Sequence, residues 1–396
     1  MSETRTRALS LAERDRRWTA IRAAMQGRGL DCLIVRGISS KWDSGTANVR
    51  YISQIGGNGE ELMAVFPITG EPVIFIWAPS QLDWWGEAQD WVGDIRQGSP
   101  SWAEATLACV KDMGFGRARI GVVGIGGANE AGRCMSYDIY TAILAGLPEA
   151  RLEPASDIIE AIRLIKSDEE VEYLARASAL CDVGVEAMLA AARPGATAQE
   201  VYGEIVGAIL RAGGESPMFL MYEADPQPRH ALRFPSDRTL APGYMILQEI
   251  SPKYAGYWSQ VMVPVSLGEP DPVYRRMADA ACLGYQAAID TIRAGITTRA
   301  LAEAINEPIR DAGFVWYRPQ WQGLGLEQTE SPMDLHYRAG AGAGDGIVLE
   351  RNMVLGLQPM AGTPDRSKGV QLGDAVVVTE DGVRRLGRTE MRFHIL

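Results

Sequence analysis

The sequence predicts two domains: an α/β domain at the N-terminus, then an α+β domain that carries an internal duplication. Three observations predict this. The chain has 396 residues, more than one hydrophobic core of average size needs. Strand and helix signals alternate through the first part of the chain. A turn–helix–glycine pattern then occurs twice. We place the domains at residues 1–155 and 156–396.

Helical and extended segments follow one another in the first domain. Residues 11–30 have apolar side chains at helical spacing and end at a glycine, whereas residues 31–37 are a short apolar run typical of a buried strand. Two β-rich runs within residues 61–77 are joined by a turn containing Gly70 and Pro72, which indicates a hairpin. Further signals predict helices over 102–114 and 133–146 and a strand over 119–127.

The second domain begins with one long predicted helix, residues 157–193, and the duplication follows it. Each copy has a turn, an N-cap threonine, a helix and a terminating glycine, followed by β-rich sequence. The repeated residues are Arg193, Gly195, Thr197, Ile205, Ile209, Ala212 and Gly213, which recur as Arg293, Gly295, Thr297, Ile305, Ile309, Ala312 and Gly313. Two related halves predict one curved sheet backed by helices, with a site between them on the concave face. The alternative is chance similarity between two amphipathic helices.

Composition excludes several classes of partner. The net charge is −11 and the sequence has no basic stripe, so nucleic acid is not an expected partner. No apolar run reaches the ~18 residues of a membrane span, and the charged N-terminus lacks the apolar core of a secretory signal. The five cysteines are scattered without a C-x-x-C pair, which favours a reducing cytoplasm. A small molecule is the expected partner.

Several motifs of the second domain together resemble one family. They are "IRLIKSDEEVEYLARA", "ARPGATAQEV", "IRAGITTRAL", "AGYWSQ", "GLGLE", "LQPMAG" and "VVVTEDG". They are similar to the family of creatinase, aminopeptidase P, prolidase and methionine aminopeptidase, which has the "pita-bread" fold. The resemblance covers nearly the whole chain and implies a homodimer, in which each N-terminal domain reaches towards the partner's site.

The resemblance also marks the positions where most members of the family hold two metal ions. Those members use two aspartates, one histidine and two glutamates, and the matching positions here are Glu249, Gln260, Gln322, Gln358 and Gly373. One carboxylate, three neutral amides and a glycine are a poor ligand set for a divalent ion, so we expect no metal and no cofactor. The alternative is that the true ligands lie nearby, although the chain has only three histidines, His230, His336 and His394.

Creatinase is the metal-free branch of this family, and the resemblance implies a catalytic histidine at His230. An unperturbed histidine titrates near neutral pH and suits proton transfer. The creatinase carboxylate positions fall at Met262 and Gln358, so the expected substrate differs from creatine. These points predict a metal-independent, creatinase-like hydrolase of a small C–N bonded substrate, amide or amidine. The alternatives are a metal-free lyase or isomerase and a non-catalytic binding protein.

Two carboxylates are expected to assist His230. Glu249 lies in an apolar strand, where burial raises the pKa of a carboxyl group, and its alternative role is an ion pair with Arg229 or Arg233. Glu330 follows Thr329, where the family often has a second histidine. We therefore predict that His230, Glu249 and Glu330 are catalytic.

Amides and aromatic rings are expected to hold the substrate. Gln260, Gln322 and Gln358 offer donors and acceptors without charge, and they either contact the ligand or bond to one another. Trp258 and Gln260 are two apart on one predicted strand, so their side chains share a face. The predicted substrate-binding residues are Gln260, Gln322, Gln358, Arg229, Trp258 and Trp321. Residues 317–332 are expected to form a strand that turns through a tight glycine loop and returns, with Gln322 before the loop and Glu330 after it.

Overall fold

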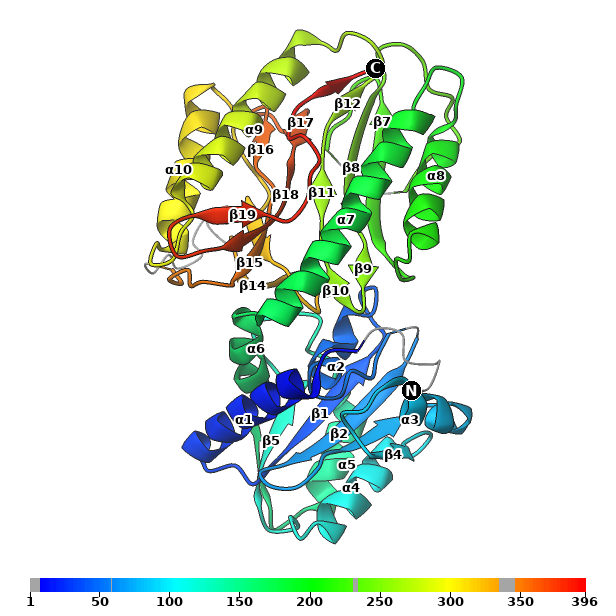
Figure 1. The fold of residues 1–396 in the computed structure, drawn as a ribbon, viewed down its shortest axis with the longest axis vertical. Helices are drawn as coiled ribbons and strands as arrows, with labels where there is room; N and C mark the ends of the chain where they lie inside the picture. Colours follow the sequence, from blue (N-terminus) through cyan, green and yellow to red (C-terminus); the bar gives the residue numbers. More distant parts are fainter. Residues whose placement is uncertain (1–7, 58, 231–233, 335–345) are drawn as a thin grey trace. The chain divides into compact units, whose positions relative to one another are not determined.

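A computed structural model describes residues 8–57, 59–230, 234–334 and 346–396 (Figure 1). The chain divides into two compact units, Met1–Leu164 and Ile165–Leu396. The boundary predicted after residue 155 lies just before α6 (Ser156–Leu164), and the structure keeps this helix with the first unit.

The first unit contains a six-stranded sheet. Its strands, from edge to edge, are β4 (Asp94–Gln97), β3 (Val73–Ile76), β2 (Glu61–Pro67), β1 (Cys32–Ile38), β5 (Arg119–Val123) and β6 (Arg151–Pro154). The pairs β1–β2 and β2–β3 are antiparallel, and β3–β4, β1–β5 and β5–β6 are parallel. The sequence does not reveal β4 and β6 because both are short edge strands that are largely polar.

Helices complete the first unit. They are α1 (Leu11–Arg28), α2 (Ala47–Ser53), α3 (Leu82–Ala88), α4 (Trp102–Asp112), α5 (Tyr137–Gly146) and α6, with short 3₁₀ turns at Ser44–Thr46 and Pro79–Gln81. Side chains of α4 and α5 pack with alternate residues of β1 to β3 in one apolar core, for example Cys109 and Ile143 with Ile34 and Val65. The α/β domain predicted for this part of the chain is therefore confirmed.

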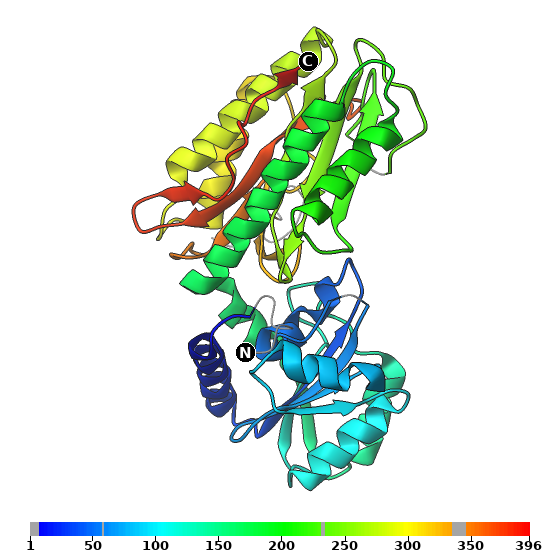
Figure 2. The same cartoon turned by 45° about the vertical axis from the view of Figure 1, so that its right-hand side comes forward.

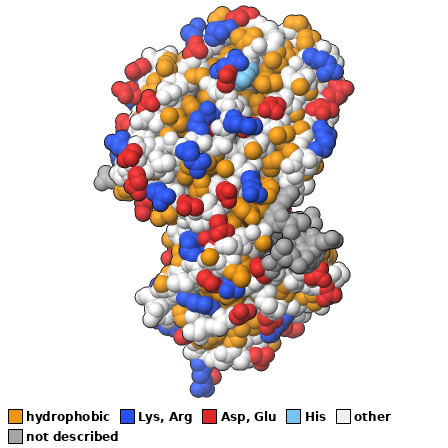
Figure 3. All heavy atoms as spheres, in the orientation of Figure 1, with side chains coloured by type: hydrophobic (Ala, Val, Ile, Leu, Met, Phe, Trp, Pro, Cys, Tyr) orange, Lys and Arg blue, Asp and Glu red, His pale blue; other side chains and the backbone are white. Residues whose placement is uncertain are grey.

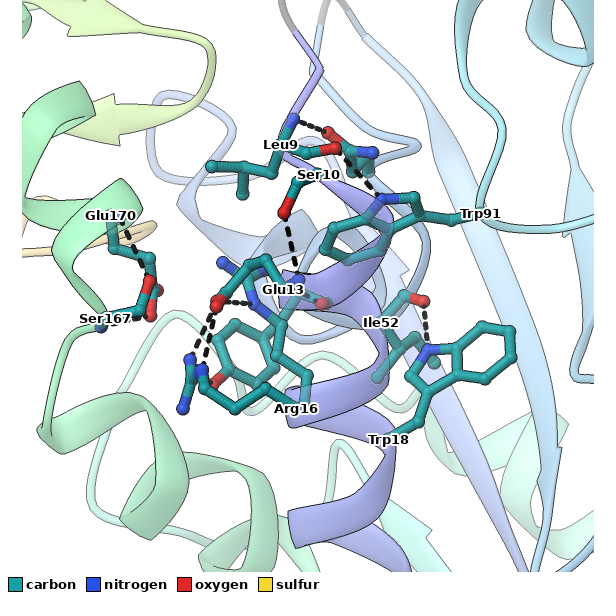
Figure 4. Close-up of polar contacts among 12 residues, drawn as sticks. Leu9, Ser10, Glu13, Arg16, Trp18, Ile52, Trp91, Ser167 and Glu170 are labelled. Atoms are coloured by element: carbon teal, nitrogen blue, oxygen red, sulfur yellow. Dashed lines mark hydrogen bonds and ion pairs between the residues drawn. The ribbon is translucent and has the colours of Figure 1, made fainter.

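Polar contacts hold α1 in place (Figure 4). The Ser10 hydroxyl caps the helix by accepting from the backbone N–H of Glu13. Further along, the indole N–H of Trp18 donates to the carbonyl of Ile52 over 2.9 Å. Because the Trp18 bond reaches a residue distant in sequence, it fixes the helix to its own unit.

The second unit is built on a ten-stranded sheet. Its main path runs β14 (Glu330–Met333), β13 (Trp321–Gly323), β15 (Val354–Leu357), β18 (Gly373–Val378), β11 (Val261–Met262), β8 (Met245–Ser251), β12 (Val265–Ser266) and β20 (His394–Ile395). In addition, β7 (Phe219–Asp225) pairs with β8, and β19 (Val383–Arg385) pairs with β18. Two small hairpins complete the strands: β9 (Lys253–Tyr254) with β10 (Tyr257–Trp258), and β16 (Met360–Gly362) with β17 (Gly369–Gln371).

The two halves of this sheet meet where β11 pairs with β18, with Val261 opposite Asp374 and Met262 opposite Gly373. We call this junction the seam. Strands β7, β8 and β12 lie on one side of it, and β13, β14 and β15 lie on the other. The predicted hairpin over residues 317–332 is the antiparallel pair β13–β14.

The duplication is visible in the helices, which are α7 (Asp168–Ala191), α8 (Ala198–Arg211), α9 (Pro272–Thr291) and α10 (Thr298–Asp311). Thr197 and Thr297 cap α8 and α10 with nearly the same backbone angles, φ −89° and ψ 155° against φ −90° and ψ 153°. Gly195 and Gly295 precede them with φ of 91° and 90°, a conformation that favours glycine. Figures 1 and 2 show α7–α8 in green and α9–α10 in yellow along the sheet. The prediction of an internally duplicated α+β domain is confirmed.

The single long helix predicted over 157–193 is wrong, because the chain forms α6 and α7 with a break at residues 165–167. Ser167 caps α7 in a capping box: its hydroxyl accepts from the N–H of Glu170, and the carboxylate of Glu170 accepts from the N–H of Ser167. The backbone N–H of Lys166 donates to the carbonyl of Asn352 and not to a helix carbonyl. Apolar periodicity continues across this break, so periodicity alone does not reveal it.

Two further features concern the charge of the surface and the hydrophobicity of the helices. On the face drawn in Figure 3, basic and acidic side chains are interspersed. Among the described residues, no helix is both long enough and apolar enough to cross a membrane.

Candidate active site at the seam

A hydrogen-bonded chain of side chains crosses the strands beside the seam. The Thr329 hydroxyl donates to Gln322 Oε1 over 3.2 Å, and Gln322 Nε2 donates to Gln260 Oε1 over 3.0 Å. Gln260 Nε2 donates in turn to Gln358 Oε1 over 3.1 Å, and Gln358 Nε2 donates to the carbonyl of Pro319. We call this set the amide chain. The three glutamines predicted as a group therefore lie together and bond to one another, and their contact with a ligand stays a prediction.

A glycine makes room for the amide chain. Gln322 on β13 lies opposite Gly356 on β15. A Cβ atom on Gly356 would lie 2.5 Å from Gln260 Nε2, closer than real contacts allow. The Gln260 amide therefore occupies the space that any side chain at position 356 would need.

We expect Gly356→Ala to displace the Gln260 amide and break its bonds to Gln322 and Gln358. Unsatisfied buried amides cost about 1–3 kcal/mol, so the free energy of unfolding should fall by about that amount in urea denaturation. Gly203→Ala is the matched control, because a Cβ there meets nothing within 4 Å and the residue is exposed on α8. This control should be neutral or slightly stabilising. An equal loss in both variants would contradict the account of Gly356.

Glu249 lies at one end of this polar group, on β8. Its Oε1 accepts from Gln328 Nε2 over 3.0 Å, and Gln328 Oε1 lies 2.6 Å from the Thr329 hydroxyl, whose single proton is shared between Gln328 Oε1 and Gln322 Oε1. Burial raises the pKa of Glu249 to about 7, although Arg318 and the bond from Gln328 act in the opposite direction. The described residues give Glu249 no ion pair, Arg229 is exposed, and Arg233 lies outside the described part of the chain. Glu249 is thus a partly buried carboxyl group with no ion pair among the described residues.

His230 is buried, with 3% of its surface exposed, and has φ of 56°. Burial, with a smaller effect from Arg318, lowers its pKa to about 3. With this lowered pKa the ring is neutral at pH 7, whereas an unperturbed histidine titrates near neutrality. The sequence does not show this burial, because a loop flanked by prolines is more often exposed. The catalytic role of His230 stays a prediction, in which a neutral ring donates or accepts hydrogen bonds.

Glu330 is held by a buried ion pair. Its Oε2 lies 3.1 Å from Lys166 Nζ, and both side chains are 2% exposed. Its Oε1 accepts from the backbone N–H of Glu327 over 3.0 Å. Glu330 stands opposite Gly323 across the β13–β14 hairpin, next to Gln322. These contacts hold the hairpin, and a catalytic role for Glu330 stays a prediction.

The remaining predicted residues occupy different environments. Trp258 and Trp321 are fully buried, and the Trp258 ring lies 5.2 Å from Lys253 Nζ. Arg229 is exposed, and its backbone N–H donates to Glu223. The single strand predicted through Trp258 and Gln260 is wrong: β10 ends at Trp258, and Gln260 lies before β11. Contacts of Arg229, Trp258 and Trp321 with a substrate stay predictions.

The described residues do not fit a two-metal centre at the matching positions. They contain no group of three or more His, Cys, Asp or Glu side chains that could hold a metal ion. The side-chain amides of Gln260, Gln322 and Gln358 are hydrogen-bonded to one another. Gly373 has φ of 152°, and a Cβ there would lie 2.1 Å from the carbonyl oxygen of Leu357. The backbone at Gly373 thus leaves no room for the glutamate that the resemblance implies there. His336 lies outside the described residues.

Sequence reasoning missed four residues of this group. Arg318 acts electrostatically on both Glu249 and His230, Gln328 bonds to Glu249, Gln371 bonds to the His230 side chain, and Lys166 pairs with Glu330. Gln328 adjoins Thr329 in the motif "GLGLEQTE". This position next to a family site residue was the one feature of the sequence that could have identified Gln328 as part of the site. Nothing in the local sequence marks Arg318 or Lys166, since their partners lie 88 and 164 residues away.

Comparisons with known proteins agree with this architecture. The model of Metallopeptidase family M24 matches residues 172–380, and the model of the Creatinase/Prolidase N-terminal domain matches residues 17–165. The uncharacterized peptidase YqhT of Bacillus subtilis is 27% identical over 91% of this chain and 96% of its own. The Xaa-Pro dipeptidase of Pyrococcus furiosus is 27% identical over 59% of this chain and 66% of its own. The crystal structure of X-Pro aminopeptidase from Thermotoga maritima superposes with a TM-score of 0.80 at 17% identity, covering 96% of this chain and 99% of that one.

These relatives correct the functional expectation. The matching family is one of metallopeptidases, and the relatives are named as peptidases, dipeptidases and an aminopeptidase. The expectation of a metal-independent, creatinase-like hydrolase is therefore wrong, and its alternatives, a lyase or isomerase and a non-catalytic binding protein, find no support among them. The two-domain pita-bread fold is confirmed. By its fold and by the match over more than half of its length, the chain belongs to metallopeptidase family M24.

Proposed function

We propose that this chain hydrolyses a small peptide or peptide-like amide, with Glu249 as the acid–base group. The observation that carries the proposal is the environment of Glu249: a carboxyl group beside the amide chain, with no ion pair among the described residues and a pKa raised by burial to about 7. A general acid or base works best when its pKa lies near the working pH. The dipeptidase and peptidase names of the relatives support the substrate class.

The proposed step uses groups of this chain. Ionised Glu249 takes a proton from a water molecule as the water oxygen bonds to the amide carbon, and the protonated carboxyl then gives that proton to the leaving nitrogen. Each amide of Gln260 and Gln358 uses one N–H in the amide chain and keeps a second, whereas Gln322 uses both. The two remaining N–H groups are suited to an oxygen that gains negative charge.

No step is assigned to a metal ion, because the described residues present one carboxylate at the matching positions. The proposal retains the roles predicted for His230 and Glu330 and the substrate contacts of Arg229, Trp258 and Trp321. We also propose that the protein is cytoplasmic and forms a homodimer.

The test is a panel of dipeptides incubated with the purified chain, with and without added Mn²⁺, Co²⁺ or Zn²⁺, and with creatine as the comparison substrate. We expect free amino acids from at least one dipeptide and no urea from creatine. Failure to cleave any dipeptide under all metal conditions would overturn the proposal. Glu186→Gln, an exposed carboxylate on α7, is the control variant that should keep wild-type rates.

A further inference from the structure

The two carboxylate oxygens of Glu249 have different surroundings. Oε1 accepts from Gln328 Nε2 over 3.0 Å, and this is the one hydrogen bond that the described residues give to the Glu249 side chain. Oε2 therefore has no hydrogen-bond partner within the described part of the chain. A carboxylate that is held by one oxygen keeps the acceptor sites of the other oxygen for a water molecule or a ligand.

Gln328 is itself held, both at its side-chain amide and at its backbone. The residue is buried, with 8% of its surface exposed. Its Oε1 lies 2.6 Å from the Thr329 hydroxyl, and its backbone carbonyl accepts from Gln322 Nε2 over 3.1 Å. In the residue before it, the backbone N–H of Glu327 donates to Glu330 Oε1. A side chain that is fixed in this way has little conformational entropy left to lose when it binds Glu249.

The neighbours of the Gln328 amide also fix its direction. With the amide turned over, Gln328 Oε1 would face Glu249 Oε1, and two acceptors in contact repel each other when the carboxylate is ionised. The Thr329 hydroxyl, in contrast, has a proton to offer to Gln328 Oε1. Only the direction with Nε2 toward Glu249 therefore gives both neighbours a favourable contact.

Thr329 connects Gln328 to the amide chain. Its hydroxyl lies 3.2 Å from Gln322 Oε1 as well as 2.6 Å from Gln328 Oε1. Gln322 belongs to β13 and Glu249 to β8, on opposite sides of the seam. The position of Glu249 Oε1 is thus set from the other half of the sheet. Support of this kind keeps a reactive side chain in one geometry, which the flexible glutamate side chain does not achieve alone.

We propose that Gln328 is a positioning residue that holds Glu249 Oε1, so that Oε2 is the oxygen that moves the proton. The inference rests on the proposed function, because it assigns the proton transfer of that function to one atom. Oε2 takes the proton from the water molecule as the water oxygen bonds to the amide carbon, and it returns the proton to the leaving nitrogen as the C–N bond breaks. Gln328 acts through Glu249 and gives up no proton in this step.

The first experiment separates turnover from binding for a dipeptide that the wild type cleaves. Gln328→Met removes the hydrogen bonds and keeps much of the bulk, so kcat should fall about 10-fold or more while KM stays within about three-fold. Thr329→Val should also lower kcat, because it removes the hydroxyl that fixes the amide, and Thr329→Ser should restore it. Gln199→Met, exposed on α8, is the matched control and should keep wild-type kcat. Unchanged kcat in Gln328→Met, or equal losses in Thr329→Val and Thr329→Ser, would overturn the inference.

The second experiment asks whether Gln328 acts through Glu249. In the Glu249→Gln background, which cannot take a proton from water, adding Gln328→Met should cost no further turnover. A purely structural role would add its own loss, so additive losses overturn the inference and leave the proposed function intact. If Glu249→Gln alone keeps wild-type turnover, the proposed function fails, and the inference fails with it.

The third experiment needs no turnover. Urea midpoints are measured for Gln328→Met, Glu249→Met and the double variant, each of which removes the bond between the two side chains. The double variant should be more stable than the sum of the two single changes predicts, because the same bond is lost only once. Strictly additive midpoints would show that Gln328 does not hold Glu249, and they would overturn the inference even if no dipeptide is cleaved.

Discussion

Glu249→Gln should lower the turnover of a cleaved dipeptide by about 100-fold or more, the usual contribution of general acid–base catalysis. Glutamine keeps the size of the side chain and an oxygen that can accept from Gln328, but it cannot take a proton from water. Substrate affinity should therefore stay within about three-fold of the wild type. Single-turnover kinetics and equilibrium binding separate the two effects. A variant that keeps wild-type turnover would remove Glu249 from the mechanism.

The same substitution has a pH-dependent effect on stability. Burial raises the pKa of Glu249 from its ordinary 4.5 to about 7, so the folded state holds a proton that the unfolded state has lost between these values. The wild type should therefore lose stability as the pH rises through this range. Glu249→Gln removes that loss. At pH 8 the free energy of unfolding of the variant should exceed that of the wild type by at most about 3 kcal/mol, measured by urea denaturation, and at pH 4 the two should be equal. A difference that is constant with pH would contradict the raised pKa.

Local sequence chemistry was sufficient for most of the fold. The repeat was visible because both helix starts need a positive-φ glycine and a capping threonine, as at Gly195 and Thr197. These requirements leave the same residues in the same order in both copies. The break before α7 was missed because the cap at Ser167 interrupts the backbone but not the apolar spacing.

The candidate site was predictable only in part. Gln260, Gln322 and Gln358 could be grouped because each stands at a position where the resemblance places a family metal ligand. Arg318 could not, since Glu249 on β8 and His230, the two groups on which it acts, are distant from it in the sequence. Burial likewise decides the pKa of His230, and burial of a loop depends on packing that no local pattern encodes.

Lys166→Met should lower the free energy of unfolding by about 3–5 kcal/mol, because it leaves the Glu330 carboxylate buried without its cation. Glu330→Gln should also destabilise, since Lys166 then loses its counter-charge. The double variant should cost clearly less than the sum of the two, because it leaves no unpaired charge. Urea denaturation of all four proteins measures this coupling. The exposed pair Arg275–Glu269 is the control, and Arg275→Met should cost less than about 1 kcal/mol.

This cycle also decides what Glu330 does. A carboxylate that only holds the β13–β14 hairpin can be replaced by glutamine without loss of turnover, provided that the variant is assayed where it is fully folded. Glutamine still offers an oxygen to the backbone N–H of Glu327, so the hairpin keeps that bond. If folded Glu330→Gln loses turnover while Lys166→Met retains it, the carboxylate itself is needed, as predicted from the sequence. If both variants keep turnover when folded, the buried pair is structural and Glu249 is the one of the two predicted catalytic carboxylates that takes part in the reaction.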